Sequence, residues 1–565
     1  MTTTTLPPGS HLDEAVRALA QRAPSWAAKE ARELAALVRE TRATTATVAA
    51  EWAETAALAK GLTLGTQPVS EEWQSGPWAL LRHLRILESS LDTLAVGRKP
   101  RLPGTIRRNH MGRVVVPTYP IDRWDRILFP GIRAETWMQP GVAIDDVTRR
   151  QASAFDASAA APGVALVLGA GNITSIGPMD ALHKLFTDRV PAILKMSPVL
   201  DHLTHIMCHA LRPLIEADGL RIVTGGSEAG SALTHDPRIT QVHITGSDTT
   251  YEHVMFGTGE DGQPAKSNDG PILPKIVTAE LGNVTPVIIV PGPWTERDLA
   301  YQSENLAVTL MHNAGFNCIA TRLFVQHETW PQREAVRARI EGVMANTPPR
   351  DPYYPGAVDR YRLFSDTHPE ATTCGPTTAV PWTMIPGLDP DADSEICFER
   401  EAFAAVTAEV GIPASNAAEF LAAAVEFCNE RVWGTLGVSI FIHPETETDP
   451  LMVQALAHAL REFRYGTIAV NCWSGLGYAM SSTPWGAYPG QTPYDIQSGV
   501  GFVHNALMLD GVEKTVVRAP WRSVPKPTWF PSHRSADRVL EASTFFEADP
   551  GLVGLARVVR AGMGA

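Results

Sequence analysis

The sequence predicts an α/β protein built on parallel strands with helices on both faces of the sheet. From about residue 162 onward, short apolar strands alternate with helical segments. Strands such as 164–168 and 192–196 are apolar without a break, which is typical of strands buried on both faces. Residues 11–97 also show apolar side chains three and four positions apart, the pattern of amphipathic helices. These observations favour a layered α/β fold preceded by a helical segment.

Composition restricts the class of protein. The chain has 565 residues, 44% of them hydrophobic and 19% charged, which is enough for two or three globular domains. The net charge of −13 argues against a nucleic-acid partner. No apolar run approaches the roughly 20 residues that cross a bilayer, and residues 1–10 lack the pattern of a signal peptide. We therefore expect no membrane contact and a cytoplasmic location.

The spacing of the cysteines predicts neither a disulfide framework nor a zinc site. The six cysteines are spread thinly, and no two of them form a CxxC pair. Neither a zinc ribbon nor a disulfide scaffold is expected, and we predict no metal site.

The local patterns predict individual elements along the chain. Residues 112–119 and 124–129 resemble two strands of an extended hairpin, and 201–217 resembles one long helix. Residues 257–274 are rich in Gly, Pro, Asp and Asn and are expected to form a surface loop. A second α/β region follows from about 294 to 471, and the part beyond 480 is expected to be irregular, with a late helix near 536–540.

Three polar residues stand at or just beyond the ends of predicted parallel strands: Asn172, Lys195 and Ser247. Ligands of open α/β sheets bind at the carboxyl ends of the strands, so these residues mark a candidate site. Each has a simpler interpretation when taken alone. Asn172 can be an ordinary turn residue and Lys195 a lysine whose stem lies along apolar surface.

A cysteine and a glutamate are the candidate reactive groups. Cys318 lies between a helical segment, 296–312, and an apolar strand, 321–326, at a turn rich in Asn and Gly. A lone cysteine is more often inert core, but a thiol at such a turn can face a cleft. Glu280 ends an apolar strand, where partial desolvation raises the pKa of a carboxyl group and suits it to act as a general base.

Together these residues belong to six motifs that resemble, in the same order, those of the aldehyde dehydrogenase superfamily. The motifs are Gly169-Ala-Gly-Asn172, Lys195-Met-Ser-Pro198, Ile244-Thr-Gly-Ser247, Glu280-Leu-Gly282, Asn313-Ala-Gly-Phe-Asn-Cys318 and Arg400-Glu-Ala-Phe-Ala-Ala-Val406. The likeness runs from about 110 to about 490. It implies a Rossmann-like cofactor domain, an α/β catalytic domain and a β-hairpin oligomerisation arm.

The resemblance also implies a division of the chain. The expected parts are an N-terminal helical part of the cofactor domain (1–111), the hairpin arm (112–150), the NAD(P)-binding domain (151–280), the catalytic domain (281–490), oligomerisation strands (491–520) and a C-terminal extension (521–565). The arm and the late strands are expected to pair subunits into a homodimer or homotetramer. The extension is expected to cover that interface or the mouth of the substrate tunnel.

The resemblance implies a role for each reactive residue in NAD(P)-dependent oxidation of an aldehyde to a carboxylic acid. Cys318 would add to the aldehyde as a thiolate, forming a thiohemiacetal and then a thioester. Asn172 and the backbone N–H of Cys318 would hold the oxyanion, and Glu280 would activate the hydrolytic water.

The same likeness implies a binding site for NAD or NADP. Lys195 would bond the adenine ribose, Gly246 and Ser247 would face the pyrophosphate at a helix N-terminus, and Glu401 would hold the nicotinamide ribose with Phe403 near the ring. Pro198 stands where NAD-preferring members often carry an acid, so NADP is permitted. Other departures are Asn283 in place of a glycine and Ala404-Ala405 in place of Gly-Pro.

The expected substrate tunnel is lined by Ile173, Ile176, His312 and Trp473, which suggests a bulky or aromatic aldehyde. Three alternatives stay open. A CoA-acylating dehydrogenase often lacks an acid at the position of Glu280, so its presence favours hydrolysis. A silent scaffold would not need Cys318, Glu280 and Asn172 together. A cysteine hydrolase would leave the dinucleotide-site residues unexplained.

Overall fold

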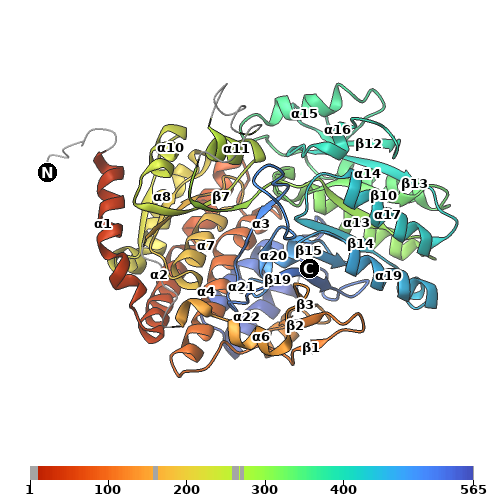
Figure 1. Ribbon diagram of the computed structural model, residues 1–565. Helices are drawn as coiled ribbons and strands as arrows, with labels where there is room; N and C mark the ends of the chain where they lie inside the picture. The colour runs from red at the N-terminus through yellow and green to blue at the C-terminus, as the bar shows by residue number, and fades with distance from the viewer. Residues whose placement is uncertain (1–9, 157–162, 258–265, 267–272, 564–565) are drawn as a thin grey trace.

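The computed structural model describes residues 10–156, 163–257, 266 and 273–563, and it confirms the predicted α/β class (Figure 1). A six-stranded sheet has the order β17-β8-β7-β4-β5-β6, in which all neighbours are parallel except β17, which pairs antiparallel with β8. Its strands are β4 (Val164–Leu168), β5 (Ala192–Lys195), β6 (Leu220–Val223), β7 (Ile239–Thr245), β8 (Ile276–Glu280) and β17 (Gly499–Val500).

An eleven-stranded sheet, of order β1-β2-β3-β19-β15-β14-β9-β10-β13-β12-β11, forms the second half of the molecule. Its strands are β1 (Arg107–Arg108), β2 (Val114–Tyr119), β3 (Arg133–Met138), β9 (Thr285–Ile289), β10 (Thr321–His327), β11 (Thr372–Cys374), β12 (Trp382–Leu388), β13 (Val406–Ile412), β14 (Gly437–Phe441), β15 (Thr467–Val470) and β19 (Val512–Arg518). Its central strands are buried along their whole length, as unbroken apolar runs predict.

Helices cover both sheets. Those around the six-stranded sheet are α1 (Ser10–Ala27), α2 (Ala31–Ala59), α3 (Val69–Trp73), α4 (Ala79–Leu94), α7 (Ile176–Leu182), α10 (Ser227–His235) and α11 (Asp248–Phe256). Those that follow are α13 (Glu296–Met311), α14 (Arg333–Asn346), α15 (Ala357–Ser365), α16 (Ile396–Glu399), α17 (Ala417–Arg431), α19 (Pro450–Glu462), α20 (Gly475–Ala479), α21 (Ala536–Ala548) and α22 (Leu552–Gly562). No helix within the described ranges is long and apolar enough to cross a membrane.

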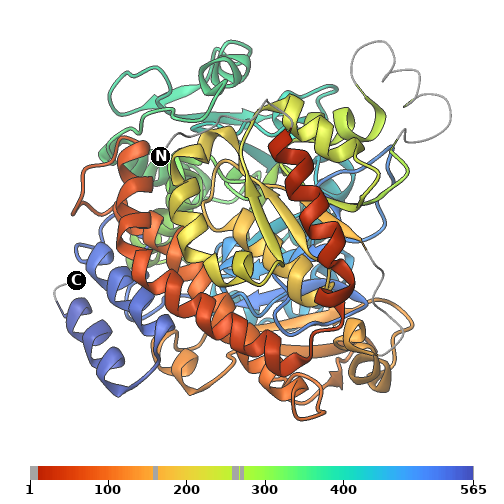
Figure 2. The same ribbon diagram turned by 90° about the vertical axis from the view of Figure 1, so that its left-hand side faces the viewer.

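The C-terminal helices pack beside the N-terminal helical segment on one side of the molecule. Figure 2 shows the C-terminal helices α21 and α22 beside the long helix α2. The buried Arg82 guanidinium on α4 pairs with Asp125 and with Glu547 of α21, each at 2.9 Å. Helix α21 of the C-terminal extension is therefore packed against the N-terminal helices.

One predicted strand is a helix. Residues 124–129 were expected to be the second strand of the hairpin, but 124–128 belong to α5 (Arg123–Leu128) and Phe129 follows as its C-cap. The Asp122 carboxylate accepts hydrogen bonds from the backbone N–H groups of Trp124 and Asp125, and this N-cap outweighs the apolar pattern of the segment. The strand that pairs antiparallel with β2 is β3, a few residues later.

The long helix predicted over 201–217 is interrupted. A 3₁₀ segment (Pro198–Leu203) is followed by α8 (Thr204–Ala210) and α9 (Arg212–Glu216). Pro213 has no N–H to continue the helical ladder, so the chain restarts there with the proline in the first turn of α9.

The strands that were expected to pair subunits have partners within the chain. β19 pairs parallel with β15 and antiparallel with β3, so the hairpin arm extends this chain's own catalytic sheet. The homodimer or homotetramer therefore stays a prediction from the sequence, as do the domain boundaries. Most of the loop expected at 257–274 lies outside the described residues.

Candidate active site

Two cavities meet at the predicted reactive residues. The larger, of about 830 Å³, lies at the carboxyl ends of β4, β5 and β7. The second is a narrow space of about 60 Å³ between aromatic and aliphatic side chains. Four residues line both cavities: Asn172, Ile176, Glu280 and Cys318. The three residues predicted from the strand ends, Asn172, Lys195 and Ser247, thus line one cavity.

Cys318 and Glu280 are in contact. The thiol of Cys318 donates to Glu280 Oε1, with a Sγ–Oε1 distance of 3.6 Å. Burial raises the pKa of Glu280 to about 7, so its carboxylate is a base poised near neutral pH. Burial, and then the neighbouring Glu280 carboxylate, hold the pKa of the Cys318 thiol well above its usual range. The resting pair is thus a thiol beside a carboxylate that can take its proton.

The turn before Cys318 has an unusual backbone. Asn313, Ala314 and Gly315 have φ values of 54°, 57° and 81°, three left-handed residues in succession. A Cβ at Gly315 would come within 2.7 Å of the Ala404 carbonyl oxygen, so only glycine fits at this point of the turn. This backbone carries the chain from α13 into β10 with Cys318 facing both cavities.

Asn172 follows β4 and reaches the same turn. Its side-chain amide Nδ2 donates to the Phe316 carbonyl oxygen at 2.9 Å, two residues before Cys318. The side chain is buried and lines both cavities. A side-chain N–H in this place can support negative charge that develops next to Cys318.

All the predicted cofactor-binding residues line the larger cavity: Lys195, Gly246, Ser247, Glu401 and Phe403. Lys195 ends β5, and burial lowers the pKa of its ammonium group. Ser247 caps α11, where its Oγ accepts from the Thr250 N–H, so the N-terminus of this helix opens on the cavity and favours an anion.

The far wall of the cleft is formed by Glu401 and an aromatic group. Burial raises the pKa of Glu401 to about 7, and its Oε1 accepts no hydrogen bond from the described part of the chain. The Glu401 side chain also accounts for the glycine at position 282, because a Cβ at that position would lie 2.0 Å from Glu401 Oε2. Phe403 packs on Tyr354 with ring centroids 5.0 Å apart. A cation, a helix N-terminus and a buried acceptor in one wide cleft fit a dinucleotide.

The predicted tunnel residues Ile173, Ile176, His312 and Trp473 all line the narrow cavity. The sequence interpretation missed the rest of its wall. The further lining residues include Gln74, Leu476, Tyr478, Trp485 and Trp529. Trp529 belongs to the C-terminal extension, which was expected to cover either the tunnel mouth or an interface. The abundance of tryptophan beyond residue 470 was a signal, but nothing local showed which indoles reach the site.

Comparisons with known proteins agree with this arrangement. Residues 190–357 match the model of the aldehyde dehydrogenase family. Over 158 residues, 28% of either chain, the sequence is 30% identical to 4-trimethylaminobutyraldehyde dehydrogenase A of Danio rerio, so the match spans about a quarter of that relative's length. The fold is similar to aldehyde dehydrogenase 21 of Physcomitrella patens, solved with the reaction product succinate (TM-score 0.59, 16% identity, 90% of this chain and 89% of that one). Residues 190–357 thus match the aldehyde dehydrogenase family, and the chain as a whole has the fold of the solved aldehyde dehydrogenases.

A second solved aldehyde dehydrogenase is similar over nearly the whole chain. It is aldehyde dehydrogenase C of Pseudomonas syringae, in complex with NAD⁺ and octanal (TM-score 0.58, 15% identity, 92% of this chain and 90% of that one). At such identities the likeness concerns the fold, and the roles of individual residues rest on the geometry described above.

One departure from the superfamily motif has a structural explanation. Asn283, which replaces a glycine, is fully buried. Its Nδ2 donates at 2.9 Å to Thr285 Oγ1 and to the Gly437 carbonyl oxygen. The Asn283 side chain thus connects the end of β8 to β14, and the acid at 280 keeps its place.

Proposed function

We propose that this chain oxidises an apolar aldehyde to the corresponding carboxylic acid, with NAD or NADP as oxidant. The observation that carries the proposal is the 3.6 Å contact between Cys318 Sγ and Glu280 Oε1 at the junction of a wide polar cleft and a narrow apolar cavity. A nucleophile, its base and a place for each reactant meet at one point.

The first step is addition of Cys318 to the aldehyde. Glu280 accepts the thiol proton, and the sulfur forms a bond to the carbonyl carbon. The carbonyl oxygen becomes an oxyanion, which the Asn172 amide and the Cys318 backbone N–H stabilise. The product of this step is a thiohemiacetal on Cys318.

The second half of the reaction releases the acid. NAD or NADP, when bound, supplies the hydride acceptor. Lys195, the N-terminus of α11 at Gly246 and Ser247, and Glu401 would hold it in the cleft, with Phe403 forming part of the same wall as Glu401. Oxidation leaves a thioester on Cys318. Glu280, after releasing the thiol proton to solvent, takes a proton from water as the water oxygen adds to the thioester carbon. The C–S bond then breaks, and the Cys318 thiolate leaves and is reprotonated by Glu280.

The tunnel supports an apolar substrate, bulky or aromatic. Its wall is mostly aromatic and aliphatic, with Trp473, Trp485 and Tyr478 among its members. Such a wall gains little from a charged aldehyde, which would have to be desolvated without a partner. The similar enzyme from Pseudomonas syringae was solved with octanal, an apolar aldehyde.

The test uses the purified full chain, a panel of aliphatic and aromatic aldehydes, and NAD or NADP, each with and without CoA. Absorbance of the reduced cofactor reports turnover. We expect turnover with apolar aldehydes in the absence of CoA. No turnover with any aldehyde, once cofactor binding is confirmed by fluorescence titration, would refute the proposal. Strict dependence on CoA would instead identify the acylating alternative.

A further inference from the structure

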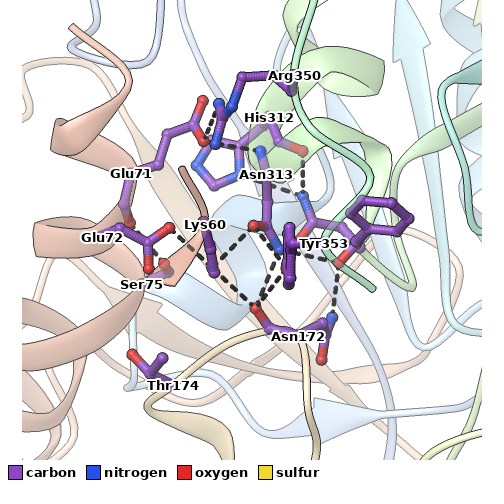
Figure 3. Close-up of polar contacts among 12 residues, drawn as sticks. Lys60, Glu71, Glu72, Ser75, Asn172, Thr174, His312, Asn313, Arg350 and Tyr353 are labelled. Carbon is purple, nitrogen blue, oxygen red and sulfur yellow. Dashed lines mark hydrogen bonds and ion pairs between the residues drawn. The ribbon is translucent and has the colours of Figure 1, made fainter. Parts of the chain in front are cut away.

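A buried polar cluster lies directly beneath the turn that carries Cys318 (Figure 3). Its members come from regions far apart in the sequence. Lys60 caps the C-terminus of α2, Glu71 and Glu72 belong to α3, and Asn313, Arg350 and Tyr353 come from the second half of the chain. The proposed mechanism assigns none of these six residues a role.

Lys60 is the centre of the cluster. Its side chain is 3% exposed, and its Nζ donates at 2.8 Å to Glu72 Oε1, at 2.9 Å to Asn313 Oδ1 and at 3.2 Å to the Asn172 carbonyl oxygen. An ammonium group has three protons, so these contacts use its full donor capacity. Burying such a charge is costly, and the Glu72 carboxylate offsets part of that cost.

Three donors converge on the backbone carbonyl oxygen of Asn172. They are Lys60 Nζ at 3.2 Å, Asn313 Nδ2 at 3.1 Å and the Tyr353 hydroxyl at 3.3 Å. The Tyr353 hydroxyl also lies 3.0 Å from Asn313 Oδ1. Lys60 and Tyr353 therefore share both acceptors. One acceptor belongs to Asn172 of the proposed oxyanion site, and the other belongs to Asn313 in the turn that leads to Cys318.

Asn313 transmits these contacts to the Cys318 turn. It adopts a left-handed backbone, and its N–H donates at 2.9 Å to Glu71 Oε2. Glu71 is in turn paired with Arg350 at 3.0 Å, and although burial opposes ionisation, this guanidinium helps to keep the pKa of Glu71 below its usual value. Asn313 Nδ2 also donates at 3.0 Å to the Phe316 carbonyl, the same oxygen that accepts from the Asn172 amide.

We propose that Lys60 is a positioning residue for the oxyanion site, which it assembles by holding the Asn172 backbone and the Asn313 side chain against each other. The proposal rests on the proposed function, since it concerns the residue pair Asn172 and Cys318. Its consequence is that the N-terminal helical segment completes the active site, although it contributes no reacting group.

The expected loss of kcat on removing Lys60 follows from the geometry of the site. A displacement of about 1 Å in a reacting arrangement can cost on the order of 10²-fold in rate, and loss of one oxyanion donor costs about 10²–10³-fold. Lys60 touches neither the substrate nor the reacting atoms, so the loss from removing it is expected to be smaller, roughly 10- to 100-fold in kcat.

The main variant is the double substitution K60M/E72Q. It removes the ammonium group and the Glu72 charge together. An unpaired, buried Glu72 carboxylate would by itself strongly destabilise the protein. Turnover of aldehyde and acylation by 4-nitrophenyl acetate are both measured, and iodoacetamide titration of Cys318 counts the competent sites. The ester needs the nucleophile and the oxyanion site but neither aldehyde nor dinucleotide.

We expect K60M/E72Q to lower kcat and the rate of ester acylation together, while the Kd for the cofactor and the pH midpoint of kcat stay at the wild-type values. A purely structural role would lower the thermal midpoint and leave kcat per titrated site unchanged, and that result overturns the proposal. If the wild-type chain hydrolyses the ester but oxidises no aldehyde, the proposed function fails while the ester comparison still decides the role of Lys60.

Two further variants keep the test decisive. Y353F removes the hydroxyl that shares both acceptors of Lys60 at almost no change in volume, and we expect a drop in kcat of roughly threefold to tenfold. Wild-type kcat in Y353F overturns the proposal even if K60M/E72Q does not fold. The matched control is R333M/E409Q, which removes a partly buried ion pair between Arg333 Nε and Glu409 Oε1 at 2.7 Å, away from both cavities. It should lower the thermal midpoint and leave kcat unchanged.

Discussion

The two cavities that meet at Cys318 are built in opposite ways. The dinucleotide cleft, of about 830 Å³, is lined largely by residues that directly follow the strands β4, β5, β7 and β8. The tunnel, of about 60 Å³, takes its walls from separate parts of the chain, including Gln74 near the start and Trp529 near the end. A site at strand ends is fixed by the topology of a parallel sheet, whereas a tunnel depends on how distant segments pack. The residues of a site at strand ends can be predicted from sequence motifs, whereas the residues that line a tunnel are identified only from the structure.

The largest effect is expected where the cavities meet. Replacing Cys318 with alanine removes the only side chain proposed to bond covalently to the substrate, and the loss should be on the order of 10⁶-fold, down to background. The Kd for NAD or NADP, measured by fluorescence titration, should stay near the wild-type value because the cleft keeps its other walls. Residual turnover above background would show that the nucleophile is misassigned.

Glu280→Gln should give the second largest effect. We expect kcat to fall by about 10²–10⁴-fold, because the base that serves both the thiol and the water is lost. Stopped-flow measurements should show a burst of reduced cofactor followed by slow turnover if acid release becomes limiting. An equal loss in the burst would instead place the main role of Glu280 at the thiol.

The Glu280 carboxyl group also predicts the direction in which kcat and stability change with pH. Since burial raises the pKa of Glu280 to about 7, kcat should rise with pH through that region as the base ionises. The raised pKa also means that the folded state binds a proton more tightly than the unfolded chain. Stability from this group is therefore present below its unfolded pKa of 4.5 and is lost as pH rises toward 7. Glu280→Gln should raise the thermal midpoint more at pH about 8 than at pH about 5.

A substitution in the tunnel distinguishes the proposed roles of the two cavities. Trp529→Ala enlarges the tunnel, so kcat/KM should shift in favour of longer aldehydes by roughly tenfold, the range that one or two methylene groups supply. The cofactor Kd should not change. Phe545→Ala removes a half-exposed aromatic of the same C-terminal segment outside the tunnel and serves as the control. The same shift in both variants would contradict the assignment of Trp529 to the substrate wall.

An effect of similar size, limited to one of the two cofactors, is expected in the cleft. Pro198 lines it three residues after Lys195, and Pro198→Glu would place a carboxylate near the adenine ribose. We expect kcat/KM for NADP to fall by roughly tenfold, because like charges about 4 Å apart cost one to a few kcal/mol near a surface. The value for NAD should change little. Pro198→Gln, which adds bulk without charge, should leave the ratio of the two cofactors at its wild-type value.

The sequence was a good guide wherever the physics is local or topological. Asn172, Lys195 and Ser247 were placed in one cleft because carboxyl ends of parallel strands share an edge. Residues 124–129 were misjudged because the cap at Asp122 outweighed their apolar pattern. Lys60 could not be predicted, since a lysine at the end of an amphipathic helix normally reaches water. Its burial depends on Glu72 and Asn313, which only the folded chain brings within 3 Å.

The position of β19 has a consequence for how the protein is made. This strand, Val512–Arg518, lies between β3 (Arg133–Met138) and β15 (Thr467–Val470). About two-thirds of the chain must therefore be synthesised after the β2–β3 hairpin before β19, its neighbour in the sheet, becomes available. Until then β3 presents an open edge, which invites pairing with other chains. Efficient production should accordingly depend on chaperones that shield this edge during synthesis, and refolding from denaturant should be slow and sensitive to protein concentration.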